Sequence, residues 1–288
     1  MKKIYLLTLS GMLLVGVSCQ NEKKAEEQEQ PTVVQNIDAQ KYRTELSKKT
    51  ADLQQKLRTA NQNQANQLLT EYRKIFDNIL DSLNLAEENT LTNRYLWDDF
   101  DARPDTIQQK IEQYDKLNLH FEPVDSTRLQ LKLKPSFYYK TFQRKVSKDV
   151  RAYLLLESSI QFGNYDQLDL TDALGLIRKD LLNYEKFLTD YENSDYYNDV
   201  QKKYVKLIKA YWYGTENRQH VSFSTKTMSP EFEQELISLV KKDPATITAQ
   251  LSKKYADFFL DKGNAFPADA FEKEVKSYIQ NALEKSFR

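Results

Sequence analysis

The clearest helical pattern in this 288-residue chain lies in Thr171–Gly214, which reads TDALGLIRKDLLNYEKFLTDYENSDYYNDVQKKYVKLIKAYWYG. Its apolar residues recur every three or four positions in two runs, the spacing of a buried helix face. Thr171 and Ser194 stand before the two runs and are residue types that cap helix N-termini, and Gly214 follows the second run. Only a few residues around Glu192 separate the runs. The stretch therefore predicts two antiparallel helices, an αα-hairpin.

The composition of the whole chain agrees with a helical fold. Hydrophobic residues make up 40% of the sequence, which contains only 6 Gly and 7 Pro. Average usage would give roughly 20 Gly and about 14 Pro in a chain of this length. All-β sandwiches and Rossmann folds need many turn glycines, so the scarcity argues against both classes. We expect an all-α fold, a multi-helix body built of antiparallel helical hairpins.

Further helices are expected on both sides of this hairpin. Before the hairpin, the apolar spacing predicts helices over 38–84 and 91–100, a helix from Pro104 to Leu117, and one long helix that runs through Phe142 and Leu154 to near Gly163. After the hairpin, cap and proline signals predict helices that begin at Ser229-Pro230, at Asp243-Pro244 and at Pro267. Asn61–Gln64 is either a bend between two helices or a polar patch in one helix. The absence of Gly and Pro there slightly favours one continuous helix over 38–84.

One segment lacks the helical period. Pro123 and Pro135 bracket a stretch in which Leu129, Leu131 and Leu133 alternate with polar residues, a period of two. We expect a short strand or an extended loop near 124–134. The surrounding residues 120–135 are also the best candidate for a boundary within a body that spans 38–288.

The first residues indicate export. Met1-Lys2-Lys3 precedes 14 apolar or small residues, too few to cross a bilayer core, which needs about 20. This is the pattern of a secretory signal over residues 1–18. Gly16-Val17-Ser18-Cys19 resembles the lipobox of bacterial lipoproteins, although Gly16 replaces the usual Leu-like residue. The resemblance implies that Cys19 becomes the lipidated first residue of the mature protein, carrying acyl chains such as palmitate.

A polar segment follows Cys19. Residues 20–30 include Ala25 as their only apolar residue, so 19–37 is expected to be a flexible tether. Its charged run is loosely similar to the surface-export signals of Bacteroidota lipoproteins, and a linker with no sorting content is an equal alternative. Gln20 differs from the Asp that resembles an inner-membrane retention signal, which favours the outer membrane. Which face of that membrane the body occupies is left open.

Several classes of chemistry are excluded or unsupported. One Cys and two His exclude Cys/His zinc sites, Cys-ligated clusters and intrachain disulfides. The sequence contains no P-loop, dinucleotide fingerprint, GxSxG or HExxH motif. No catalytic residue, metal or cofactor is therefore assigned. Removal of residues 1–18 leaves 40 basic against 42 acidic side chains, a balance that gives no steering toward nucleic acid or anionic lipid.

Two groups of residues are candidates for a ligand surface. Trp97, Asp98 and Asp99 combine an aromatic ring with carboxylates that could bind a cation or a sugar, although helix capping and solvation are the simpler explanation. Tyr211 and Trp212 lie in the densest aromatic run, and Arg218 follows it. Consecutive rings point to different faces of a helix, so some are expected off the core, where Tyr and Trp suit interfaces. The alternative is that these rings fill the core.

Two functional hypotheses follow from the sequence. The first is a non-enzymatic lipoprotein of the cell envelope, attached to the membrane through its N-terminal lipid and binding an unknown envelope protein or glycan through helical surfaces. The alternative is an envelope polysaccharide hydrolase that uses paired carboxylates, which leave no sequence spacing to recognise. A deep pocket lined by two close carboxylates and aromatic rings would favour the enzyme.

Overall fold

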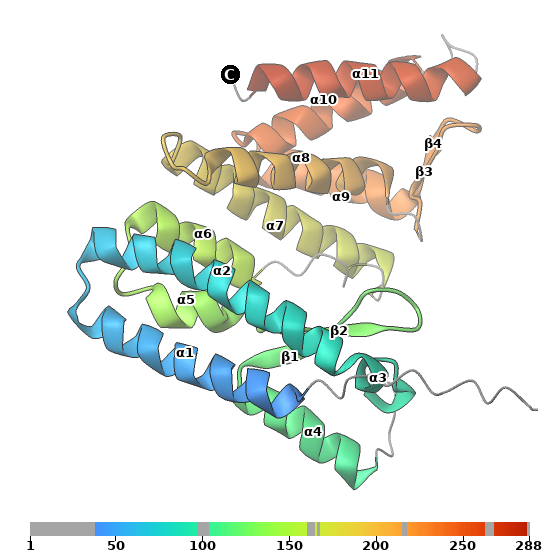
Figure 1. Ribbon diagram of the computed structural model, residues 1–288. Helices are drawn as coiled ribbons and strands as arrows, with labels where there is room; N and C mark the ends of the chain where they lie inside the picture. Colours follow the sequence, from blue (N-terminus) through green and yellow to red (C-terminus); the bar gives the residue numbers. More distant parts are fainter. Residues whose placement is uncertain are drawn as a thin grey trace, which may run out of the picture. The chain divides into compact units, whose positions relative to one another are not determined.

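The computed structural model describes residues 38–96, 104–159, 165, 168–214, 218–262 and 268–286. Within these ranges it contains helices α1 to α11, one short 3-10 helix and two small antiparallel strand pairs (Figure 1). The prediction of an all-α fold with one strand-like segment is therefore confirmed. None of the helices in the described ranges is both long and apolar enough to cross a membrane.

The N-terminal part is a helical hairpin. α1 (Ala39–Thr59) and α2 (Gln62–Ala86) pack side by side (Figure 1), so the preference for one continuous helix is wrong. Asn61 ends the continuity, because its side chain accepts a hydrogen bond from the Gln64 backbone while the Gln64 side chain accepts one from the Asn61 backbone. This reciprocal capping box starts a new helix without Gly or Pro.

A short helix and a β-hairpin follow α2. α3 (Glu88–Leu91) and the 3-10 turn Arg94–Leu96 stand where a helix over 91–100 was expected, and 97–103 lies outside the described residues. α4 (Asp105–Lys116) leads into β1 (Leu119–Pro123), which pairs with β2 (Leu129–Leu133). The predicted extended segment is thus half of a hairpin, with Leu129 and Leu131 buried.

The next helical region is interrupted. α5 (Ser136–Phe142) and α6 (Lys148–Ser159) pack against each other, so the expectation of one long helix is wrong. The break at Ser147 is stabilised from α2: the Ser147 backbone donates to the Asn66 side chain at 3.3 Å, and Asn66 donates back to the Ser147 hydroxyl at 3.1 Å. Such a partner, distant in sequence, leaves no trace in the local apolar period.

The hairpin around residues 171–214 is confirmed. α7 (Leu170–Asp190) and α8 (Tyr197–Tyr213) pack along each other. The capping residue of α7 is Asp169, whose carboxylate accepts from the Asp172 backbone, and not Thr171. Gly214 ends α8 with φ +93°, a conformation in which other residues are strained.

The C-terminal part covers this hairpin. The strand pair β3 (Val221–Ser222) and β4 (Thr227–Met228) precedes α9 (Pro230–Lys242), which Ser229 caps as expected. α10 (Ile247–Lys262) begins later than Asp243-Pro244 predicts, because Thr246 caps it by accepting from the Ala249 backbone. α11 (Ala268–Ser286) packs on α10, and α9 and α10 both pack on α7.

Residues 37–288 belong to one compact unit. Its core is rich in aromatic side chains, and the largest fully buried residues are Trp212, Tyr72, Tyr114, Tyr204, Tyr211, Tyr255, Phe76, Phe142, Phe232, Phe259 and Phe271.

Candidate functional site

The structure places the sequence-predicted candidates in three different settings. Cys19 and the group Trp97, Asp98 and Asp99 lie outside the described residues. Tyr211 and Trp212 are fully buried. Arg218 is partly exposed in the segment that follows α8. The candidates are therefore not brought together into one site within the described part of the chain.

The two aromatic candidates belong to the core. Trp212 stacks on Tyr255 with ring centroids 5.4 Å apart and donates from Nε1 to the Ser252 hydroxyl at 3.1 Å. Tyr211 packs edge-on against Phe232, and its hydroxyl donates to Glu235 at 3.3 Å. The expectation that these rings lie at a ligand surface fails because α8 is covered by both α7 and α10.

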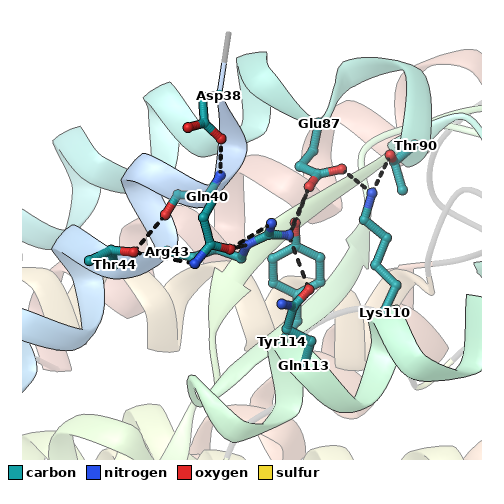
Figure 2. Close-up of polar contacts among 9 residues, drawn as sticks. All are labelled: Asp38, Gln40, Arg43, Thr44, Glu87, Thr90, Lys110, Gln113 and Tyr114. Carbon is teal, nitrogen blue, oxygen red and sulfur yellow. Dashed lines mark hydrogen bonds and ion pairs between the residues drawn. The ribbon is translucent and has the colours of Figure 1, made fainter. Parts of the chain in front are cut away.

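Glu87 is one of the buried polar residues of the described chain, and it organises what we call the Glu87 cluster: Arg43, Glu87, Lys110 and Tyr114. Its carboxylate is only 4% exposed. One carboxylate oxygen accepts from Lys110 Nζ at 2.5 Å. The other oxygen lies 3.4 Å from Arg43 Nη1 and also accepts from the Tyr114 hydroxyl (Figure 2). Burial alone would raise the pKa of Glu87, but the bonds from Lys110, Thr90 and Tyr114 hold that pKa below its ordinary value. The cluster ties α1, the α2–α3 junction and α4 together.

A second polar cluster brings two carboxylates to one hydroxyl group. We call it the Tyr153 cluster: Arg73, Tyr153, Glu157, Asp199 and Lys203. The Tyr153 hydroxyl bonds to Glu157 at 2.7 Å and to Asp199 at 2.9 Å. The ring of Tyr153 also stacks on a neighbouring tyrosine of the α7–α8 connection, with centroids 4.0 Å apart.

Cations neutralise both carboxylates of the Tyr153 cluster. Lys203 lies 2.7 Å from Asp199 and 3.6 Å from Glu157, and Arg73 forms a close ion pair with Glu157. Partial burial would raise the pKa of Asp199, but the hydrogen bond and charge of Lys203 lower it below its ordinary value. A general acid needs the opposite shift. The arrangement therefore suits a partly exposed ion network that joins α2, α6 and α8.

The histidines and carboxylates give no sign of a metal centre. Across the described ranges, no group of three or more His, Cys, Asp or Glu side chains could hold a metal ion. His220 is buried against Phe232, and its Nε2 lies 2.6 Å from the Tyr211 carbonyl oxygen. Burial lowers the pKa of His220, so the neutral ring donates to that carbonyl as a packing residue.

The strongest candidate for binding is a groove that we call the basic groove. It has a volume of about 470 Å³ and is lined by residues of α1, α5 and two connecting segments: Gln54, Leu57, Arg58, Asn118, Phe137, Lys140, Thr141, Arg144 and Lys145. Four of these nine side chains are cationic and none is acidic. Leu57 and Phe137 are buried and form its apolar floor.

The backbone around the basic groove is fixed by specific contacts. Lys145 Nζ donates to the Arg58 carbonyl oxygen at 3.2 Å, which caps the C-terminal end of α1. Asn118 adopts φ +58°, and its carbonyl accepts from the Lys134 backbone at 2.7 Å. Arg58, Lys140 and Arg144 are exposed, and their side chains form no ion pair within the part of the chain that the structure describes.

Sequence reasoning missed the basic groove. Its residues come from three segments, 54–58, 118 and 137–145, and the balanced total charge hides their convergence. The one local signal is the run Lys140–Lys148, which contains four basic residues including Lys140 itself and no acidic residue. That run alone could not indicate that α1 would bring Arg58 beside it.

Comparison of the chain with protein-family models, with curated proteins and with solved structures gives no match in any of the three.

Proposed function

We propose that this protein is a lipid-anchored component of the cell envelope that binds an envelope partner, a protein or a glycan, through the surface of its helices and catalyses no reaction. One contrast carries the proposal. Glu157 and Asp199, the two carboxylates that share the Tyr153 hydroxyl, are paired with cations in an ion network, whereas Arg58, Lys140 and Arg144 of the basic groove are exposed to solvent. Available charge therefore lies at a surface suited to binding rather than at paired acids suited to hydrolysis.

The anchoring part of the proposal depends on the N-terminal sequence. Cys19 stands at the position where a lipobox-type signal would be cleaved, and 19–37 would link it to α1, which begins at Ala39. Fully extended, these nineteen residues span at most about 65 Å. Acyl chains on Cys19 would hold the body at the membrane. We propose the outer membrane, on either of its faces.

A polysaccharide hydrolase is the alternative function, and the Tyr153 cluster is the observation in its favour. Two carboxylates share one hydroxyl there beside a stacked aromatic pair. The cations speak against it, because Arg73 and Lys203 already pair with the two carboxylates and leave neither free to act on a sugar. Release of reducing sugar from cell-wall glycan that disappears in Asp199→Asn would establish the alternative and contradict the binding proposal.

Phase partition with a lipid label tests the anchoring proposal. Wild-type protein expressed in a bacterial host with labelled palmitate is expected to enter the detergent phase and carry the label. Cys19→Ala is expected to lose both, because the acceptor sulfur is gone. Ser18→Ala keeps a small residue before the cysteine and is the matched control, which should behave as wild type. Equal labelling of Cys19→Ala would overturn the proposal.

A further inference from the structure

We infer that the basic groove is a binding site for a phosphate ester. The inference goes beyond the proposed function, because a phosphate ester is a ligand distinct from the protein or glycan partner proposed above, bound at a site of its own on the same body.

The charge of the groove is the first argument. Arg58, Lys140, Arg144 and Lys145 converge on one hollow of about 470 Å³ whose lining contains no carboxylate. The Glu87 cluster and the Tyr153 cluster, by contrast, pair each of their carboxylates with a cation. Cations held together without a counter-charge repel one another, and an anion that enters between them removes that repulsion. The groove therefore favours an anionic ligand.

The kind of cation selects among anions. Arg58 and Arg144 carry planar guanidinium groups that bond two oxygens of one anion at a time, and Lys140 adds a mobile point charge. A phosphate monoester has three acceptor oxygens and a charge of about −1.5 to −2 at neutral pH. A carboxylate has two oxygens and one charge, which leaves most of the groove's positive charge uncompensated. Phosphate is the better match.

The remaining lining suits the organic part of an ester. Gln54, Asn118 and Thr141 offer neutral donors and acceptors for hydroxyl groups, and Leu57 and Phe137 close the floor. The volume falls within the range of about 300–1,000 Å³ that is common for small-molecule sites. Lys145 is already held on the Arg58 carbonyl, so one cation is in place before a ligand arrives.

Two sources supply this chemistry, a soluble phosphate ester and the head group of a phospholipid. The test has one arm for each and uses the full-length Cys19→Ala chain, so that acyl chains on the protein cannot mediate binding. One arm titrates glycerol 3-phosphate by calorimetry. The other measures co-sedimentation with phosphatidylcholine vesicles that do or do not contain phosphatidic acid.

A pair of double variants tests the location. Lys140→Gln with Arg144→Gln removes two charges from the groove, and Lys148→Gln with Arg151→Gln removes two charges from exposed positions of α6 outside its lining. We expect the first pair to weaken binding roughly tenfold or more, because each charged hydrogen bond contributes strongly. The second pair should change binding by less than about twofold, apart from general screening.

The outcomes separate the two proposals. Binding of glycerol 3-phosphate supports the inference and assigns a soluble ligand, and binding only of phosphatidic acid vesicles supports it and assigns a head group. Absence of binding in both arms, or equal loss in the two double variants, overturns it. Failure of palmitate labelling overturns the anchor and leaves the groove untouched, since the groove is assayed without lipid on Cys19.

Discussion

The carboxylate of Glu87 joins three elements at a single buried point. Its neighbours Arg43 and Lys110 are 17% and 27% exposed, so their charges are partly removed from water. Replacing Glu87 by Gln keeps the size and removes the charge that compensates both cations. We expect Glu87→Gln to lower the free energy of unfolding by about 2–3 kcal/mol, measured by urea denaturation.

The adjacent Glu88 supplies the control. It is exposed in α3, so Glu88→Gln should change stability by less than about 0.5 kcal/mol. The folded-state pKa of Glu87 is lowered, so its stabilisation is present above the unfolded pKa and is lost as pH falls through the folded value. The difference between wild type and Glu87→Gln should therefore shrink as pH falls below about 4.3. Equal stability of Glu87→Gln and wild type at pH 7 would contradict the role of the Glu87 cluster.

Single residues were the least predictable part of the sequence. Tyr211 follows the core spacing of α8, but the adjacent ring of Trp212 points to a different face, which suggested a surface role for some of these rings. Their burial depends on α9 and α10, from which Phe232 packs on Tyr211 and Tyr255 stacks on Trp212. Glu87 likewise gives no local signal, because Arg43 and Lys110 reach it from helices separated along the chain.

At the scale of elements, the α1–α2 connection depends on Asn61. Its side chain accepts from the Gln64 backbone at 3.0 Å, which stabilises the first turn of α2. Asn61→Ala should destabilise the protein by about 1 kcal/mol in thermal or urea unfolding, the usual cost of losing such a cap. A single continuous helix would give the opposite sign, because Ala is the better helix former.

Asn63 lies two positions further on and is exposed inside α2. Asn63→Ala should therefore be neutral or slightly stabilising. Stabilisation by both alanines would show that the chain continues as one helix through Asn61.

Two glycines in the α7–α8 hairpin should respond to alanine with opposite signs. Gly175 lies inside α7 with no atom within 4 Å of an added Cβ, so Gly175→Ala should stabilise by about 0.5–1 kcal/mol. Gly214 has φ +93°, and a Cβ there would lie 2.2 Å from the Arg218 carbonyl oxygen. Gly214→Ala should cost more than the first substitution gains. Melting temperatures that are both above, or both below, that of the wild-type protein would contradict this assignment.

The elements show where local reading of a sequence succeeds. The α7–α8 hairpin was predictable because its apolar period, short connection and terminal Gly214 all lie within one stretch. The α5–α6 break was not, because the Ser147 backbone is satisfied by Asn66 of α2. The α1–α2 break was likewise missed, because the Asn61 side chain supplied the cap where neither Gly nor Pro marks it.

At the scale of the whole molecule, charge balance proved to be a poor guide to local charge. The chain carries 42 basic and 42 acidic side chains, and this equality suggested that no basic surface would form. The fold separates the charges: carboxylates such as Glu87, Glu157 and Asp199 pair with cations, while the basic groove keeps its cations together. Segregation of this kind arises only in three dimensions, so no count along the sequence reveals it.

The anchor at Cys19 is the central functional claim and requires a measurement on the native protein. The intact mass of the chain extracted from bacterial membranes decides it most directly. The account predicts a chain that begins at Cys19 and carries the added mass of acyl chains, which is absent from Cys19→Ala. A chain that retains residues 1–18, or one that begins at Cys19 with no added mass, would contradict it.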